Sequence, residues 1–365
     1  MKIAIDASRT TRADLTGTEH YALQLIRHMI VLNEQRDTPN QITLYFRDAP
    51  APDLFSQSAY VQQRIISFKR LWTHVRFAAA IMQDKPDVTF VPAHTLPFLF
   101  PGKAIVTVHD LGYKYFPDAH PGFNRRYLHW TTRYSASRAT AIFADSQATS
   151  DDLQRFYETD PAKIHVVYPG VDPPKVSELQ HVHEKYSLPE QYFVFIGTLQ
   201  PRKNIARIVQ AFDHWQQQQP DNQTGLVLAG GKGWLFDEAW VRDIENVYLP
   251  GYIDDADKGT LLGGAIVLVF PTLYEGFGFP VLEAMHAGTP VIASTTSSLP
   301  ELVGDAGILV NPEDVSAISA AMQQLIENPE LSTTLREAGK HQAQQFTWEQ
   351  AATKALMLLE QTATL

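Results

Sequence analysis

The chain of 365 residues contains no cysteine. This absence excludes disulfide bonds, thiolate metal sites and cysteine nucleophiles, and it is typical of a cytoplasmic protein. No window comes near the ~20 uninterrupted apolar residues that a membrane-spanning helix needs, and Met1 leads directly into a strand-like segment at 2–6. The sequence therefore predicts neither a membrane span nor a signal peptide, and we expect a cytoplasmic protein.

Acidic side chains are missing from two stretches of the N-terminal half, one between Asp53 and Asp84 and one between Asp118 and Asp145. The cations in these stretches are Arg64, Lys69, Arg70, Arg76, Arg125, Arg126, Arg133 and Arg138. They could form ordinary solvated helix faces, or they could present basic surfaces to an anionic partner. For segment 64–77, which also contains aromatic residues, the second interpretation predicts peripheral contact with the inner face of an anionic membrane.

The two halves of the chain differ in charge. Residues 1–175 carry 20 Lys+Arg and 17 Asp+Glu, whereas residues 176–365 carry 10 and 23, and the whole chain has a net charge of −10. This difference indicates that the two halves face different partners. Because the chain is acidic overall and shows no nucleic-acid-binding motif, we expect no nucleic-acid partner.

Short apolar runs alternate with longer helix-like patterns such as 19–32 and 124–137. This alternation is typical of parallel sheets covered by helices on both faces, and the length of the chain predicts two such domains. The expected strands are 2–6, 42–46, 87–91, 104–108, 141–144 and 164–167 in the first half and 192–196, 226–229, 247–249, 266–270, 291–293 and 308–310 in the second. The predicted fold is therefore α/β, with two doubly wound domains.

The boundary between the domains is expected within 170–189, where three prolines interrupt the periodic pattern. We predict an N-terminal domain at 1–175, a C-terminal domain at 190–345 and a final amphipathic helix within 346–365. Ligands of open α/β sheets bind at the carboxyl ends of the strands, so functional motifs are expected there, in a cleft that two facing sheets would share.

Segment 275–283 reads EGFGFPVLE, follows an expected buried strand and holds two carboxylates eight positions apart. Its glycines allow the backbone to approach a ligand closely, and a helix that begins near Phe279 would point its free N–H groups at a phosphate. Glu275 in the loop and Glu283 in the helix would then address different parts of the ligand, such as sugar hydroxyls. A plain turn followed by a helix would require neither glutamate.

A second motif follows the expected strand at 192–196, where Gly197 precedes the adjacent cations Arg202 and Lys203. Cations in a strand-to-helix loop can neutralise a diphosphate, a role that a metal ion would otherwise fill, because charge on a departing phosphate needs a fixed counter-charge. Taken alone, such a pair could be solvated surface. Next to a glycine-rich loop in an acidic domain, it favours phosphate binding.

Weaker signals lie near the expected strand ends of the N-terminal half. They are Gly17 before the first helix, His109 after strand 104–108, and Asp145-Ser146 after strand 141–144. A histidine at a strand end is often structural, and Asp145-Ser146 could simply cap a helix.

Together these motifs resemble the retaining GT-B glycosyltransferases of glycosyltransferase family four, which use nucleotide-sugar donors. The resemblance covers essentially the whole chain and rests above all on the two glutamates of segment 275–283. Its further support comes from Gly197, Arg202-Lys203-Asn204, Asp145-Ser146 and segment 167–172 (VYPGVD). It implies the GT-B architecture, in which two Rossmann-like domains face each other across a cleft and the final helix packs back on the first domain.

The resemblance also implies a role for each motif residue. Arg202 and Lys203 would hold the donor diphosphate, Glu275 would bind sugar hydroxyls and Glu283 the ribose, while His109 would contact the transferred sugar. The implied catalytic residues are His109, Arg202, Lys203 and Glu275, and the implied donor-binding residues are Gly17, Gly197, Arg202, Lys203, Glu275, Gly276, Phe277, Gly278, Phe279, Val281, Leu282 and Glu283. In place of the two adjacent glycines of many members, the chain has Thr16-Gly17-Thr18, which weakens the role of Gly17.

In the implied mechanism, the acceptor hydroxyl attacks from the side that the diphosphate leaves, the leaving phosphate takes the proton, and neither cofactor nor metal takes part. Segment 108–117 and the Arg-rich helix after it are similar to bacterial mannosyltransferases of polysaccharide or lipid-linked glycan assembly. GDP-mannose is therefore the expected donor, with UDP-glucose as the alternative, and the expected acceptor is a glycan or a lipid-linked glycan.

Other functions remain open from the sequence. Segment 254–257 (DDAD) has the Asp-x-Asp spacing of metal-dependent glycosyltransferases, although Asp residues before a helix also serve as caps, which we favour. A sugar-nucleotide epimerase or a pyridoxal-phosphate phosphorylase could use the same architecture, but no Schiff-base lysine is evident. A non-catalytic GT-B partner subunit is the alternative from outside the enzymes, and the retained charged motif residues argue against it.

Overall fold

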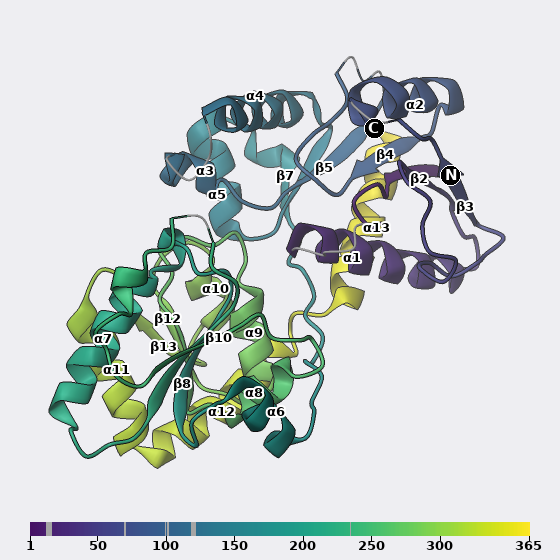
Figure 1. Ribbon diagram of the computed structural model, residues 1–365. Helices are drawn as coiled ribbons and strands as arrows, with labels where there is room; N and C mark the ends of the chain where they lie inside the picture. The colour runs from purple at the N-terminus through teal and green to yellow at the C-terminus, as the bar shows by residue number, and fades with distance from the viewer. Residues whose placement is uncertain (12–16, 69–70, 99, 101, 118–121, 234) are drawn as a thin grey trace. The chain divides into compact units, whose positions relative to one another are not determined.

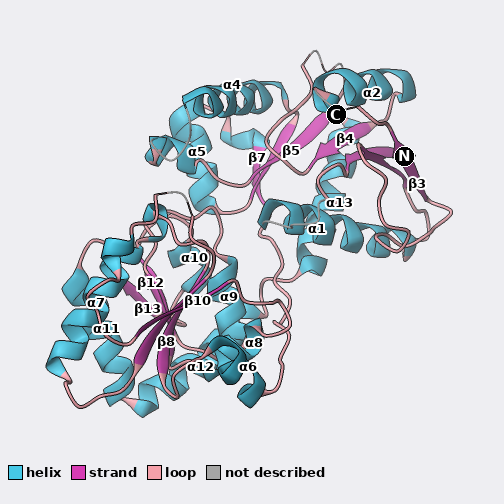
Figure 2. Ribbon diagram, in the orientation of Figure 1, coloured by secondary structure: helices cyan, strands magenta, loops and turns pink. Residues whose placement is uncertain are grey.

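The computed structural model describes residues 1–365 except 12–16, 69–70, 99, 101, 118–121 and 234. The described residues form two compact units, one from 1–170 together with 346–365 and one from 171–345 (Figure 1). Each unit is an α/β body built on a parallel sheet with helices packed against it (Figure 2). Within the described part of the chain, no helix is both long and apolar enough to cross a membrane.

The first unit holds a seven-stranded parallel sheet in the order β3-β2-β1-β4-β5-β6-β7. Its strands are β1 (Lys2–Asp6), β2 (Gln41–Phe46), β3 (Val61–Ile65), β4 (Val88–Val91), β5 (Ala104–Val108), β6 (Ala141–Ala144) and β7 (Ile164–Val166). In the central pairing, Ile3 of β1 lies between Ile42 of β2 and Val88 of β4. The chain order reverses between β1 and β4, which makes this the point where such sheets bind ligands at their carboxyl ends.

The six strands predicted for this half are confirmed, each within one residue at its ends. The sequence does not predict β3, because three of its five residues are polar and the strand pairs on one side only. Arg64 of β3 was expected on a basic surface, but its guanidinium pairs with Asp84 and lies 5.9 Å from the ring centre of Tyr45. Arg64 therefore stabilises the sheet edge.

Helices of the first unit follow the strands and cover the sheet. They are α1 (Gly17–Glu34), η1 (Thr73–Phe77), α2 (Ala78–Asp84), α3 (Gly112–Tyr115), α4 (Gly122–Arg138), α5 (Gln147–Tyr157), η3 (Pro161–Lys163) and α13 (Trp348–Thr364). The last of them, α13, packs against α1 and belongs to this unit although it is the C-terminal helix. Thr347 caps it by accepting a hydrogen bond from the backbone N–H of Gln350 at 3.2 Å. Its first residue, Trp348, is buried.

The second unit holds a six-stranded parallel sheet in the order β10-β9-β8-β11-β12-β13, whose chain order reverses between β8 and β11. Its strands are β8 (Tyr192–Ile196), β9 (Gly225–Ala229), β10 (Val247–Gly251), β11 (Val267–Phe270), β12 (Val291–Ser294) and β13 (Ile308–Val310). Its helices are α6 (Leu179–Tyr186), η4 (Pro201–Lys203), α7 (Ile205–Gln218), η5 (Glu238–Trp240), α8 (Lys258–Gly264), α9 (Phe279–His286), α10 (Leu299–Val303), α11 (Val315–Glu327) and α12 (Pro329–Ala343). All six strands predicted for this half are present; β8, β9, β11 and β12 are fully buried, whereas the edge strands β10 and β13 are largely half-buried.

The segment 171–189, expected as a linker, is part of the second unit. Its backbone crosses α8 so closely that the carbonyl oxygen of Lys175 accepts from the N–H of Gly259 at 2.8 Å, and a Cβ on Gly259 would lie 2.3 Å from that oxygen. Farther along, Lys185 in α6 contacts the carboxylates before α8. The segment is therefore anchored to the second unit.

Candidate functional site

The loops that leave β8 and β11 flank the switch point of the second sheet, and they bring together three of the predicted catalytic residues. The Nζ atom of Lys203 lies 2.7 Å from Oε1 of Glu275, and Nη1 of Arg202 lies 3.2 Å from Oε2. Lys203 and Glu275 are both buried. Two cations thus share one carboxylate, which leaves a net positive site at the carboxyl edge of the sheet, where a diphosphate can bind.

Asn204 ties the two loops to each other. Its backbone is left-handed, with φ of 63°, a conformation that asparagine tolerates. Its buried side-chain amide donates to the carbonyl oxygen of Pro271 at 2.8 Å, and the carbonyl oxygen of Arg202 accepts from the N–H of Leu273 at 3.0 Å. These bonds fix the loop that carries Arg202 and Lys203 against the loop that carries Glu275.

Two serines that the sequence analysis missed hold the backbone of Glu275. Ser297 accepts from the N–H of Glu275 at 2.9 Å, and Ser298 donates to its carbonyl oxygen at 3.1 Å. Ser297 has φ of 53°, an uncommon conformation for a residue with a side chain. The available signal was a pair of hydroxyl residues just after the buried strand β12.

Gly278 precedes α9 with φ of 129°, a backbone conformation that L side chains rarely adopt. A Cβ at this position would lie 2.8 Å from Cδ2 of Leu299. The glycine is therefore required both by its backbone angle and by the close packing of α10 on the loop.

We expect Gly278→Ala to lower donor turnover at least about tenfold and to destabilise the fold by about 1–3 kcal/mol, because it adds backbone strain and a steric clash at the loop. Thermal unfolding and nucleotide release would measure the two effects. The matched control is Gly304→Ala, which also has positive φ but meets nothing closer than 3.7 Å. Wild-type turnover in Gly278→Ala would show that the loop geometry is not needed.

The other residues of segment 275–283 divide between the loop and the core. Gly276 and Phe277 are buried, and the ring of Phe277 packs edge-on against the half-buried Phe279, with 5.2 Å between centroids. Val281 and Leu282, predicted to contact the donor, have fully buried side chains. Those two side chains therefore pack within the second unit, and the donor contact expected for Val281 and Leu282 stays a prediction.

Glu283 contacts a lysine that the sequence analysis did not single out. Its Oε1 lies 3.0 Å from Nζ of Lys258, which is also 3.7 Å from Asp255. Burial lowers the pKa of Lys258, but the charge and hydrogen bond of Glu283 together with the charge of Asp255 outweigh burial, so that the pKa is raised. Glu283, the predicted ribose ligand, thus belongs to a second ion pair on α8 and α9.

A glycine-rich loop at 230–233 was also missed. Gly230 has φ of 144°, and a Cβ there would lie 2.0 Å from the carbonyl oxygen of Gly197. The N–H of Leu199 donates to Gly231 at 2.9 Å, so this loop pairs with the predicted phosphate loop after β8. Gly197 itself has φ of 142°. The signal was three glycines within four residues directly after a buried strand.

In the first unit, His109 lies at the carboxyl end of β5 and is buried. Its Nδ1 lies 2.7 Å from Oδ2 of Asp145, its Nε2 lies 3.3 Å from the carbonyl oxygen of Pro92, and its backbone N–H donates to Nε2 of His94 at 3.2 Å. Tyr21 packs edge-on against the ring. The residue predicted to contact the sugar is thus fixed from several sides.

These contacts shift the pKa values of His109 and His94 in opposite directions. Burial lowers the pKa of His109, but the charge and hydrogen bond of Asp145 outweigh burial, so that the pKa is raised. Burial lowers the pKa of His94 to about 3, with a further contribution from His109. His94 is therefore a neutral hydrogen-bond acceptor, whereas His109 retains a proton more strongly than a free histidine.

Gly17, the other predicted residue of this unit, is exposed and begins α1. Its neighbour Thr16 lies outside the described residues.

Known proteins match the chain over nearly its whole length. Residues 16–175 match the model of Glycosyltransferase Family 4, and residues 178–342 match that of glycosyl transferases group 1. The O-antigen chain mannosyltransferase B of Escherichia coli is 31% identical over 98% of this chain and 98% of its own length. The chain belongs to this glycosyltransferase family.

Further matches agree with this assignment. The O-antigen chain mannosyltransferase RfbU of Salmonella typhimurium is 27% identical over 65% of this glycosyltransferase and 64% of its own length. The solved sucrose-phosphate synthase from Thermosynechococcus elongatus superposes with a TM-score of 0.75 at 22% identity, over 99% of this chain and 98% of that one. The GT-B architecture predicted from the sequence is thereby confirmed, and membership of the family makes the protein a hexosyltransferase that uses a nucleotide-sugar donor.

In this glycosyltransferase, aspartates of segment 254–257 form ion pairs with the side chain of Lys185. Asp254 and Asp257 lie 2.7 and 2.6 Å from Nζ of Lys185, and Asp257 also accepts hydrogen bonds from Ser177 and Tyr186. Among the described residues, no three His, Asp or Glu side chains form a group that could hold a metal ion. These aspartates attach the segment before α6 to the second unit.

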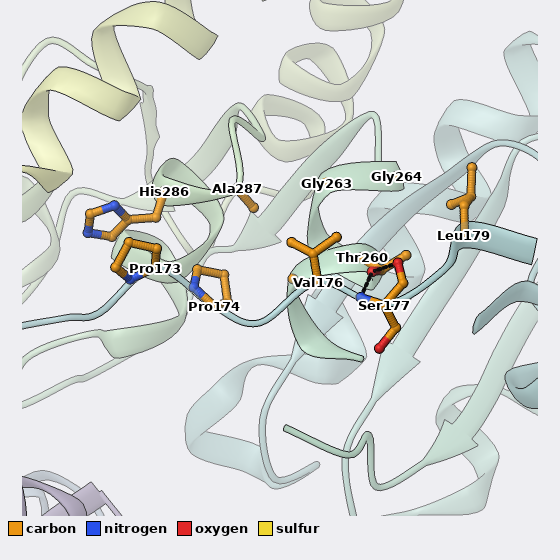
Figure 3. A pocket seen from close by; sticks show the side chains of 11 residues that line it. Pro173, Pro174, Val176, Ser177, Leu179, Thr260, Gly263, Gly264, His286 and Ala287 are labelled. Atoms are coloured by element: carbon orange, nitrogen blue, oxygen red, sulfur yellow. Dashed lines mark hydrogen bonds between the residues drawn. The ribbon is translucent and has the colours of Figure 1, made fainter. Parts of the chain in front are cut away.

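A pocket of about 450 Å³ in the glycosyltransferase lies between segment 173–179 and α8 (Figure 3). Figure 3 shows Pro173 close to His286 at one end and Val176 near Thr260. None of the residues predicted for the donor lines this pocket. It is therefore separate from the predicted donor site.

The two basic stretches of the glycosyltransferase, between Asp53 and Asp84 and between Asp118 and Asp145, are only partly available to a partner. Arg138 donates to the carbonyl oxygens of Phe100 and Gly102 at 3.0 and 3.2 Å, so it is structural. Lys69 and Arg70 lie outside the described residues. Of the described arginines in these two stretches, Arg76, Arg126 and Arg133 are exposed. The expected membrane contact stays a prediction.

Proposed function

We propose that this glycosyltransferase moves mannose from GDP-mannose to a hydroxyl of a glycan or lipid-linked glycan, with retention of the anomeric configuration and without a metal ion. The observation that carries the proposal is the cluster of Arg202, Lys203 and Glu275 at the switch point of the second sheet. The choice of mannose is supported by the mannosyltransferase that is similar over 98% of the chain. UDP-glucose is the second candidate donor.

The chemistry of the cluster suits a departing diphosphate. As the bond between the anomeric carbon and the diphosphate oxygen breaks, negative charge grows on the phosphates, and Arg202 and Lys203 are fixed cations that can stabilise it. Glu275 can accept hydrogen bonds from sugar hydroxyls. The acceptor oxygen forms the new bond on the face that the diphosphate leaves, and its proton passes to a phosphate oxygen, so the mechanism requires no separate base.

The same arrangement supports metal independence. The two cations can supply the positive charge that a divalent ion would bring. Of the two aspartates with the Asp-x-Asp spacing, Asp257 lies 2.6 Å from Nζ of Lys185 and Asp255 lies 3.7 Å from Nζ of Lys258. Because the Asp255 side chain is exposed, its pair with Lys258 contributes only about 0–1 kcal/mol to stability, and its loss should leave the fold intact.

The test is a screen of GDP-mannose and UDP-glucose in EDTA and in Mn²⁺, with released nucleotide as the readout. We expect GDP-mannose to turn over about equally in both conditions, and Asp255→Asn, which removes the first carboxylate of the Asp-x-Asp spacing, to behave like the wild type. Loss of activity in EDTA with recovery in Mn²⁺ would disprove metal independence. If UDP-glucose is turned over in preference to GDP-mannose, UDP-glucose becomes the assigned donor. If no nucleotide sugar is turned over or bound, a non-catalytic partner subunit becomes the favoured function.

A further inference from the structure

The first unit carries an aromatic cluster formed by His74, Phe98, Tyr127 and Trp130. His74 stacks on Phe98 with 3.8 Å between ring centroids, and Phe98 lies 4.5 Å from Trp130. The Nε2 atom of His74 lies 3.3 Å from the hydroxyl of Tyr127. On the outside of this cluster, Trp130 is 53% exposed and Tyr127 is 43% exposed.

The cluster lies at the edge of the sheet where ligands bind. His74 is in η1, which follows β3, Phe98 is in the loop after β4, and the other two residues are on α4, which follows β5. The segments that carry the cluster thus all follow strands of the sheet that contains the switch point between β1 and β4.

The exposed rings are held rigidly from behind. Phe98 stacks on His74 and contacts the tilted ring of Trp130, and Tyr134 packs edge-on against Phe98 with 5.2 Å between centroids. The indole and phenol therefore present a fixed surface, and binding to it requires little ordering of side chains. A rigid, half-exposed tryptophan beside a ligand-binding edge is typical of a recognition surface.

We propose that the aromatic cluster binds a pyranose ring of the glycan acceptor; this rests on the proposed function. One face of a pyranose consists of C–H groups, whose partial positive charge packs on the negative face of an indole. Its hydroxyls can bond to the hydroxyl of Tyr127 and to the exposed guanidinium groups of Arg126 and Arg133 on the same helix.

A membrane surface fits the same helix less well. An interfacial helix carries a continuous apolar stripe along its length. On α4 the exposed residues include Arg126, Tyr127, Trp130, Arg133 and Ser137, so the aromatic rings are flanked by polar residues along the helix. Isolated aromatic rings between hydrogen-bond donors suit a sugar, whose surface is apolar on one face and polar around its rim.

The test compares Trp130→Ala with the wild type, using GDP-mannose as donor and soluble α-linked mannotriose as acceptor. We expect the KM for mannotriose to rise at least about tenfold, because a central aromatic contact is lost. Hydrolysis of GDP-mannose without acceptor should not change. Tyr60→Ala is the matched control, since Tyr60 is 37% exposed but precedes β3, at the opposite edge of the sheet.

Two results would overturn the proposal. A KM for mannotriose within twofold of the wild type in Trp130→Ala would remove the sugar site. If Trp130→Ala also lost co-sedimentation with vesicles of anionic phospholipid, the cluster would be a membrane contact instead.

Failure of the proposed function would look different, because the wild type itself would turn over no nucleotide sugar. In that case a titration of the wild type with mannotriose, monitored through the NMR signals of the indole N–H groups, still tests the sugar site. A shift of the Trp130 indole signal supports the sugar site, and no shift rejects it.

Discussion

Replacing Glu275 by alanine is expected to lower turnover of the nucleotide-sugar donor by about a hundred- to a thousandfold. The carboxylate lies 2.7 Å from Lys203 and 3.2 Å from Arg202 and is itself buried. Its loss removes an acceptor for the sugar hydroxyls, and it removes the carboxylate that Arg202 and Lys203 share, so the positions of the two cations for the diphosphate are disturbed as well. One substitution therefore affects both halves of the proposed donor site.

Steady-state release of nucleotide, together with donor titration by calorimetry, would measure this effect. Glu275→Gln keeps the shape and one acceptor oxygen, so we expect intermediate activity. Glu238→Gln is the matched control, because Glu238 also pairs with a lysine of the second unit, Lys232, but is exposed. Activity of Glu275→Ala within tenfold of the wild type would remove Glu275 from the catalytic residues and with it the main support for the proposed mechanism.

Much of the fold follows from sequence because most of its strands appear as short apolar runs, which predict twelve of the thirteen strands. The exception, β3, is an edge strand whose Gln62, Gln63 and Arg64 need no burial. The charge pattern was misleading at the same place. The stretch without acidic residues ends at Asp84, and that residue is the partner that neutralises Arg64.

The candidate site, like the fold, could be predicted only in part from the sequence. The loops after β8 and β11 could be located because glycines and charged residues follow buried strands directly. Which side chains meet could not be predicted, because the contacts join distant positions: Lys258 with Glu283, and Ser297 with the backbone of Glu275. The burial of Val281 could not be predicted either, because a sequence motif does not distinguish residues that face a ligand from those that pack beneath it.

The pairing of His109 with Asp145, 36 positions apart in sequence, gives the second large expected effect. Asp145→Asn should destabilise the first unit by about 3–5 kcal/mol near pH 6, because it breaks a buried pair and His109 can then stay buried only by giving up its proton. The substitution keeps the shape of the side chain, so the change isolates charge. Asp151→Asn, on the exposed face of α5 in the same unit, is the matched control.

The pH dependence distinguishes this pair from an ordinary packing contact. In the wild type the pKa of His109 is raised above its unfolded value of about 6.5, so its contribution to stability is complete below that pH and is lost as the pH rises through the folded pKa. Without the charge of Asp145, burial dominates and lowers the pKa of His109, so the folded variant excludes a proton that the unfolded chain binds. The difference in unfolding free energy between the two proteins should therefore be larger near pH 6 than near pH 9, as urea unfolding at both values would measure. A difference that is constant with pH would mean that His109 carries no proton in the native protein.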